Sequence, residues 1–112
     1  MRIIFDSSSL ILLTKIGMMD ILTSGFECAI TDEVERECTY KKDALDAKII
    51  EKMIKDKKIK VLAAKTPINI GYEFRLEKGE ASSIALGMND ESLMVATDDK
   101  AAMNACKVLG IK

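Results

Sequence analysis

Carboxylates follow two apolar runs that lie at opposite ends of the chain. Asp6 comes directly after the run over residues 3–5, and Asp98 and Asp99 come one residue after the run over 93–96. Such short runs are typical of strands that are buried on both faces of a parallel sheet. If the two strands are neighbours, their carboxyl ends lie about 4.8 Å apart at one edge of the sheet. Like charges that close need a cation, a shared proton or hydrogen-bond donors, so the pattern indicates a metal site.

Two glutamates at the margins of apolar helix stripes are further candidates for this site. Glu37 lies about 60° from Val34 on the helical wheel, at the edge of the apolar stripe rather than opposite it. Glu80 lies four residues before Ile84, at the expected start of a later helix. Each has a functional interpretation, as an acid that faces the expected metal site at the edge of the sheet. Each also has a structural one, since Glu37 is equally an ordinary surface residue and the helix dipole favours an acid at the position of Glu80.

The composition restricts the chemistry that these acids can perform. The chain contains no histidine, and its three cysteines, Cys28, Cys38 and Cys106, are widely spaced. Catalysis by Ser-His-Asp or Cys-His groups is therefore excluded, and neither a disulfide framework nor a zinc site is expected. Carboxylate oxygens favour a hard cation such as Mg²⁺ or Mn²⁺.

Alternating strand and helix patterns connect the acids and predict an α/β fold. Strands are expected over residues 2–5, 28–30, 59–62 and 93–96, the third as a half-buried edge strand. Helices are expected over residues 8–16, 18–22, 43–57 and 100–109, and over two further stretches that begin at about residues 32 and 80. The apolar side of the helix from about residue 80 consists of Ala81, Ile84, Ala85 and Met88. Helix caps are expected at Ser7 to Ser9, at Thr31 or Asp32, and at Asp43.

Length and composition fit one ordinary domain over residues 1–112. The 112 residues are 48% hydrophobic and 31% charged, which is typical of a globular protein with its own core. The apolar stretches are shorter than the ~20 residues of a membrane span, and no signal-peptide pattern is present. We therefore expect no membrane association and a cytoplasmic location.

The positive charge is concentrated in one segment. Seven lysines stand between Lys48 and Lys65 against Glu51 and Asp56, a local charge of +5 that leaves −6 for the remainder of a chain with net charge −1. One interpretation is a surface that binds phosphates; the other is a solvated helix face and a lysine-protected edge strand. Tyr72 and Phe74 follow, and such aromatics either stack on unpaired bases or hold a loop against the body.

Four short motifs that contain these acids stand in order along the chain. They are Asp6-Ser7-Ser8-Ser9-Leu10-Ile11, Ile30-Thr31-Asp32-Glu33-Val34-Glu35-Arg36-Glu37, Gly79-Glu80-Ala81 and Thr97-Asp98-Asp99. With them, the sequence resembles the PIN-domain family of metal-dependent ribonucleases, and within it the small prokaryotic branch related to toxins of VapBC-type toxin–antitoxin pairs. The motifs cover nearly the whole chain.

The resemblance implies a fold, an activity and a set of site residues. The implied fold is a three-layer α/β/α arrangement around a parallel four-stranded sheet of order 3-2-1-4. The implied activity is hydrolysis of RNA phosphodiesters by an endoribonuclease that uses Mg²⁺ or Mn²⁺ and activated water. The acids that match the catalytic metal ligands of the family are Asp6, Glu37, Glu80 and Asp99. Asp98 is an alternative ligand beside Asp99, and Ser8 matches a polar residue that contacts the substrate.

Two departures from the family pattern motivate a second hypothesis. Relatives usually continue past the position of Gly110 with another strand and helix, whereas this sequence stops at Lys112, so we expect a sheet edge that a second copy covers in a homodimer. Met103 stands where toxin-like relatives often carry a basic residue. The alternative function is thus a catalytically weakened module that binds RNA or a protein, and an antitoxin is the expected protein partner. A receiver-like domain is a third interpretation, but Ala64 and Lys65 follow the third strand where a receiver needs an aspartate.

Overall fold

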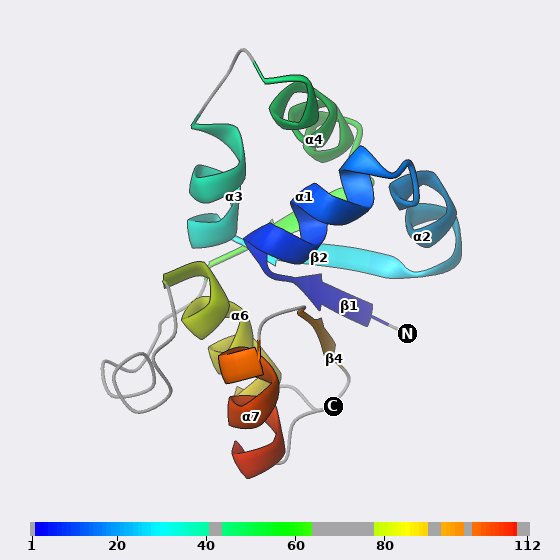
Figure 1. Ribbon diagram of the computed structural model, residues 1–112. Helices are drawn as coiled ribbons and strands as arrows, with labels where there is room; N and C mark the ends of the chain where they lie inside the picture. The colour runs from blue at the N-terminus through cyan, green and yellow to red at the C-terminus, as the bar shows by residue number, and fades with distance from the viewer. Residues whose placement is uncertain (1, 41–43, 64–77, 90–92, 98–99, 110–112) are drawn as a thin grey trace.

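In the described chain each strand is followed by one or two helices (Figure 1). The computed structural model describes residues 2–40, 44–63, 78–89, 93–97 and 100–109. In chain order the elements are β1 (Arg2–Phe5), α1 (Ser7–Lys15), α2 (Met19–Gly25), β2 (Glu27–Thr31), α3 (Asp32–Thr39), α4 (Leu45–Lys55), β3 (Ile59–Leu62), α6 (Lys78–Asn89), β4 (Leu93–Ala96) and α7 (Lys100–Leu109).

The four strands form one parallel sheet in the order β3-β2-β1-β4. Ile4 of β1 lies in register with Ala29 of β2 and with Val95 of β4. Figure 1 shows α1, α2 and α4 on one side of the sheet and α6 and α7 on the other. The predicted α/β class and the strand order 3-2-1-4 are therefore confirmed.

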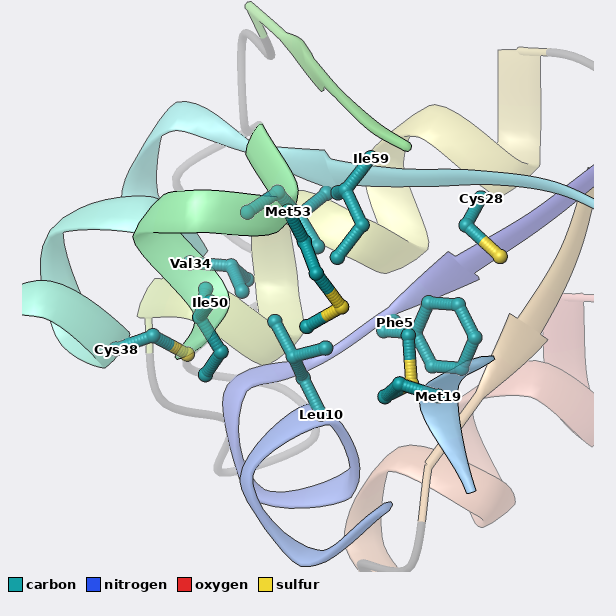
Figure 2. Close-up of a cluster of buried hydrophobic side chains, with 10 residues drawn as sticks. Phe5, Leu10, Met19, Cys28, Val34, Cys38, Ile50, Met53 and Ile59 are labelled. Carbon is teal, nitrogen blue, oxygen red and sulfur yellow. The ribbon is translucent and has the colours of Figure 1, made fainter. Parts of the chain in front are cut away.

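The main core lies between the sheet and the layer of α1 and α4 (Figure 2). Phe5, Leu10 and Ile50 are at most 1% exposed there, and each such buried side chain contributes about 1.5–3 kcal/mol. Because side chains alternate along a strand, Ile4 points to the opposite face from Phe5, and it is fully buried as well. Burial on both faces explains why β1 is an unbroken apolar run.

The start of α1 differs from the prediction. The residue that caps this helix is Asp6, whose side chain accepts a hydrogen bond from the Ser9 N–H, whereas the three serines lie inside the first turn. An aspartate in extended conformation immediately before a helix satisfies an unpaired N–H as well as a serine does. The acid that we expected as a metal ligand is thus also a structural cap.

Other helix boundaries follow the sequence patterns with small corrections. Thr31 caps α3 through its hydroxyl, which accepts from the Val34 N–H at 3.1 Å. The cap of α4 is Ala44, without a side-chain hydrogen bond, and Asp43 lies outside the described residues. Met88 was expected on the buried side of α6 but is 44% exposed; it lies in the last turn of the helix, which ends at Asn89, beyond the continuously buried residues 81–85.

Two helices end in left-handed turns of the same type. Gly17 after α1 has φ 74°, and Lys57 after α4 has φ 61°. In each turn the N–H of the following residue, Met18 or Lys58, bonds the carbonyl five residues back, at 3.0 and 2.9 Å. This is the Schellman motif, in which the left-handed position usually holds glycine. A lysine stands there in α4.

Some predictions concern residues that the structure does not describe. Tyr72 and Phe74, Asp98 and Asp99, and the segment from Gly110 lie outside the described ranges. Within those ranges, no helix is long and apolar enough to cross a membrane.

Candidate metal centre

The Asp6 carboxylate lies at the carboxyl end of β1 and is 1% exposed. Its Oδ1 atom accepts from the Ser9 N–H at 2.9 Å, from the Ser9 hydroxyl at 2.5 Å and from the Ser8 hydroxyl at 3.4 Å. Its Oδ2 atom accepts from the hydroxyl of Thr97, the first residue after β4. These donors compensate the burial of the charge. Asp6 therefore connects β1, α1 and the end of β4.

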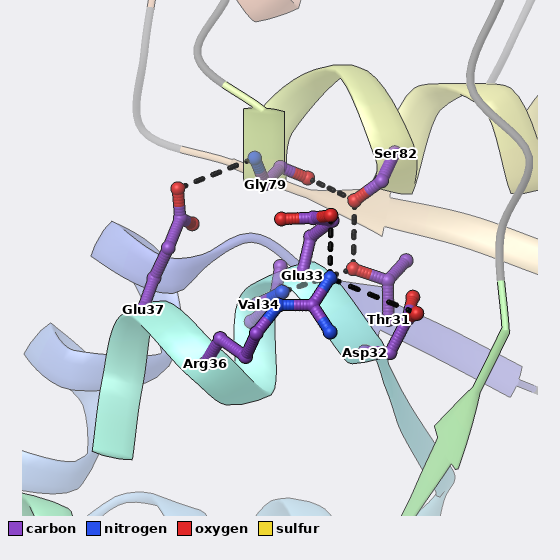
Figure 3. Close-up of polar contacts among 8 residues, drawn as sticks. All are labelled: Thr31, Asp32, Glu33, Val34, Arg36, Glu37, Gly79 and Ser82. Carbon is purple, nitrogen blue, oxygen red and sulfur yellow. Dashed lines mark hydrogen bonds and ion pairs between the residues drawn. The ribbon is translucent and has the colours of Figure 1, made fainter. Parts of the chain in front are cut away.

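The Glu37 carboxylate of α3 reaches across to two other helices. Its Oε1 atom accepts from the Ser7 hydroxyl at 2.8 Å. Its Oε2 atom accepts from the Gly79 N–H at 3.3 Å, as Figure 3 shows. Gly79 lies in the first turn of α6, where N–H groups have no partner within the helix. Since Ser7 follows Asp6 directly, the first turn of α1 holds both carboxylates.

Gly79 is required for this position of Glu37. A Cβ atom added to Gly79 would lie 1.9 Å from Glu37 Oε1 and 2.9 Å from its Cδ. No side chain fits between these groups, so the carboxylate lies directly against the backbone of α6. The close approach explains why a glycine precedes Glu80 in the sequence.

A buried hydroxyl network fixes the first turn of α6 against β2. The Thr31 and Ser82 hydroxyls lie 2.7 Å apart, and Ser82 donates to the Gly79 carbonyl at 2.8 Å (Figure 3). The neighbouring Ser83 hydroxyl lies 3.0 Å from the same carbonyl. Because Thr31 and Ser82 are fully buried, the network has few alternative arrangements. It holds the Gly79 N–H in the place where Glu37 needs it.

Negative charge gathers around Cys38, the residue after Glu37. Burial, followed by the charges of Glu37, Asp46 and Asp6, raises the pKa of the Cys38 thiol to about 12. The three acids belong to α3, α4 and the end of β1. Burial and the charge of Asp6 also raise the pKa of Cys106. Carboxylates from separate elements thus create a region of negative potential, which favours a cation.

The structure brings some of the predicted site residues together. Asp6 and Glu37 are joined through Ser7, and Glu80 is the residue next to Gly79 in α6. Ser8 lies beside Asp6, as expected for the polar residue of the motif. In the described part of the chain, however, no three acids or thiols are close enough together to hold a metal ion.

The two remaining predicted ligands, Asp98 and Asp99, lie outside the described residues. They follow Thr97 directly in the chain, and the Thr97 hydroxyl donates to Asp6. The donor set at this edge consists of carboxylate and hydroxyl oxygens, which fit Mg²⁺ or Mn²⁺ and do not fit a soft metal. Oδ2 of Asp6 and both carboxylate oxygens of Glu37 accept one bond each, and a carboxylate oxygen can accept about two.

Three residues of the site did not stand out in the sequence. Ser7 was expected only as a cap, yet it bonds Glu37; Ser9 bonds Asp6. Gly79 was expected only to precede a helix. The available signal was position alone, because each of the three adjoins a motif acid or lies within its motif.

Comparison with known proteins agrees with the fold. A family model described as a PIN domain matches residues 2–112. No curated protein and no solved structure matches the chain.

Proposed function

Because the chain belongs to the PIN-domain family, whose members are generally nucleases, we propose that it is a metal-dependent endoribonuclease of the toxin-like kind. The observation that carries the proposal is the first turn of α1, where two serines hold two carboxylates from different elements. Ser7 bonds Glu37, and Ser9 bonds Asp6. A helix start that fixes the positions of two acids is the kind of prearrangement that metal-assisted hydrolysis requires.

In this proposal the metal ligands are Asp6, Glu37, Glu80 and Asp99, with Asp98 as the alternative to Asp99. The chemistry that Mg²⁺ or Mn²⁺ supplies in such a site is activation of water for attack on a phosphodiester and neutralisation of the phosphate charge. The Ser9 and Thr97 donors fix the Asp6 carboxylate, and the Ser7 and Gly79 donors fix that of Glu37. In this proposal Ser8 contacts the RNA, and its exposure at the start of α1 supports that role.

The test is a calorimetric titration with Mn²⁺ of the wild-type protein and of Asp6→Asn. Asparagine caps a helix as well as aspartate does, so this substitution removes the charge and retains the fold. We expect the affinity for Mn²⁺ to fall at least tenfold, about 1.4 kcal/mol, and cleavage of RNA to be lost with it. The matched control is Asp20→Asn, an exposed acid in the first turn of α2, which changes the net charge equally and should bind as wild type does.

A wild-type protein that binds no Mn²⁺ at millimolar concentration, or an Asp6→Asn variant that binds equally well, would contradict the metal site. The second candidate function would then lead, namely a catalytically weakened PIN module that binds RNA or a protein. The burial of Asp6 favours this alternative, since donors on Ser8, Ser9 and Thr97 already compensate its charge. RNA binding without any cleavage, in the presence of Mg²⁺ or Mn²⁺, would support it.

The same proposal includes partners and a location. A toxin-like nuclease acts on RNA in the cytoplasm and is held inactive by an antitoxin protein. A homodimer formed through β4, which lies at the edge of the described sheet, would protect that edge from unspecific pairing. Co-expression with the protein encoded next to it, followed by size-exclusion chromatography with light scattering, tests the antitoxin complex and the homodimer.

A further inference from the structure

A stripe of three lysines, Lys48, Lys52 and Lys55, runs along the outer face of α4. The spacing i, i+4, i+7 places them within about 60° of one another on the helix and spans about 10 Å along its axis. The buried residues of the same helix, Ala47, Ile50 and Met53, lie on the opposite side. The lysine stripe therefore points away from the core.

Three more exposed lysines extend the positive charge past the end of the helix. Lys57, Lys58 and Lys60 follow within five residues of Lys55. Between residues 48 and 60 there are six lysines against Glu51 and Asp56, a charge of +4. Among the described residues, none of the six forms an ion pair within 4.0 Å.

The stripe is locally unfavourable for folding. Like charges at i, i+4 repel each other on a helix, and Lys57 occupies a left-handed position, φ 61°, that glycine adopts at lower free energy. The helix dipole favours Lys52 and Lys55 in the last turn, but it does not explain Lys48 or the lysine at position 57. Unfavourable backbone conformations that persist suggest a function for the side chain.

The helix that carries the stripe packs beside the candidate metal centre. It contacts α3, which carries Glu37, and α1, whose first turn bonds both Glu37 and Asp6. From there α4 extends about 16 Å over 11 residues. The centre itself is negative and repels phosphates. Both described arginines, Arg2 and Arg36, are paired with acids.

We propose that the lysine stripe of α4, continued by Lys57, binds the backbone phosphates of single-stranded RNA on its way to the metal centre. The inference rests on the proposed ribonuclease function for the identity of the polyanion. The stripe supplies affinity without sequence preference, because ammonium groups on flexible side chains contact phosphates and do not read bases. The carboxylates supply the chemistry.

The test is the salt dependence of RNA binding, measured without metal so that cleavage does not enter. A fluorescein-labelled oligouridylate is titrated in EDTA at several salt concentrations between about 50 and 200 mM, and fluorescence anisotropy gives the affinity. For Lys52→Gln/Lys55→Gln we expect the slope of log K against log salt to decrease by about 1.4, which is about 0.7 for each phosphate that the variant no longer neutralises. The control is Lys15→Gln/Lys107→Gln, which removes the same charge from two exposed lysines of α1 and α7 and should change the slope by much less.

A second variant separates binding from stability. Lys57→Gly replaces the lysine in the left-handed conformation by a residue that adopts it at lower free energy, so we expect the melting temperature to rise by about 4 °C. The slope of log K against log salt should decrease by about 0.7, because one phosphate contact is lost. Equal slopes for the stripe and control variants would overturn the proposal, as would a wild-type protein that does not bind the oligouridylate at low salt. If the slopes change as expected but RNA is never cleaved with Mg²⁺ or Mn²⁺, only the nuclease function fails.

Discussion

Replacement of Gly79 by alanine tests whether the position of Glu37 matters for metal binding. The new Cβ atom would lie 1.9 Å from Glu37 Oε1, whereas ordinary contacts begin at 3.4 Å, so the oxygen must move by about 1.5 Å. The side chain of Glu37 is flexible and only half-buried. We therefore expect the carboxylate to move and the backbone to stay. That movement breaks the bonds from the Ser7 hydroxyl and the Gly79 N–H.

The expected effect on stability is small and the effect on the site is large. Two hydrogen bonds of about 1 kcal/mol each are broken, reduced by solvent exposure, and alanine gains up to about 1 kcal/mol of helix propensity over glycine. The melting temperature should thus change by no more than about 8 °C. A displacement of about 1 Å at a reacting centre can lower the rate about 100-fold. We expect this reduction in RNA cleavage and at least a tenfold reduction in Mn²⁺ affinity.

Calorimetry with Mn²⁺ and a cleavage assay measure these effects, with Gly25→Ala as the control. A Cβ atom at Gly25 meets nothing within 4 Å, so this variant should behave as wild type. In a Glu37→Ala background the Gly79→Ala substitution should have no further effect on Mn²⁺ affinity, because the group that it displaces is absent. An Mn²⁺ affinity of Gly79→Ala within twofold of wild type, or an equal reduction in the Glu37→Ala background, would refute the reasoning.

Two further predictions concern the buried network and the thiol near the site. Ser82→Ala removes the hydroxyl that bonds Thr31 at 2.7 Å and should lower the free energy of unfolding by about 1 kcal/mol. Thr31→Val also removes the cap of α3 and should lower it by about 2 kcal/mol. In urea unfolding, the double variant should lose less than the sum of the two, because the substitutions remove the same hydrogen bond. The pKa of Cys38 is raised from 9.0 to about 12 in the folded protein, so above pH 9 the unfolded chain binds fewer protons and stability should fall as pH rises from 9 to 12. Cys38→Ala should lessen this alkaline destabilisation in urea unfolding, and an unchanged pH profile would show that the thiol is not responsible.

Local patterns determined most of the fold. The short apolar runs that became β1, β2 and β4 have lengths and flanking residues that favour strands, and the alanine-rich pattern of α7 favours a helix. Gly17 ended α1 because a left-handed turn favours glycine. The absence of histidine restricted the chemistry to oxygen ligands, and the order of the acid motifs identified the family. The strand order 3-2-1-4 came only with that family resemblance, since periodicity does not specify which strands are neighbours.

The arrangement of the site was decided by tertiary contacts. Asp6 caps α1 through a local bond from the Ser9 N–H, but its other carboxylate oxygen is held by the Thr97 hydroxyl, 91 positions along the chain. The role of Gly79 depends on the approach of α3 to α6, and Glu37 and Gly79 lie 42 positions apart in the chain. Spacing along a sequence predicts which side chains share a face of one element. It does not predict how closely two elements pack, and at Glu37 that distance determines where the carboxylate lies.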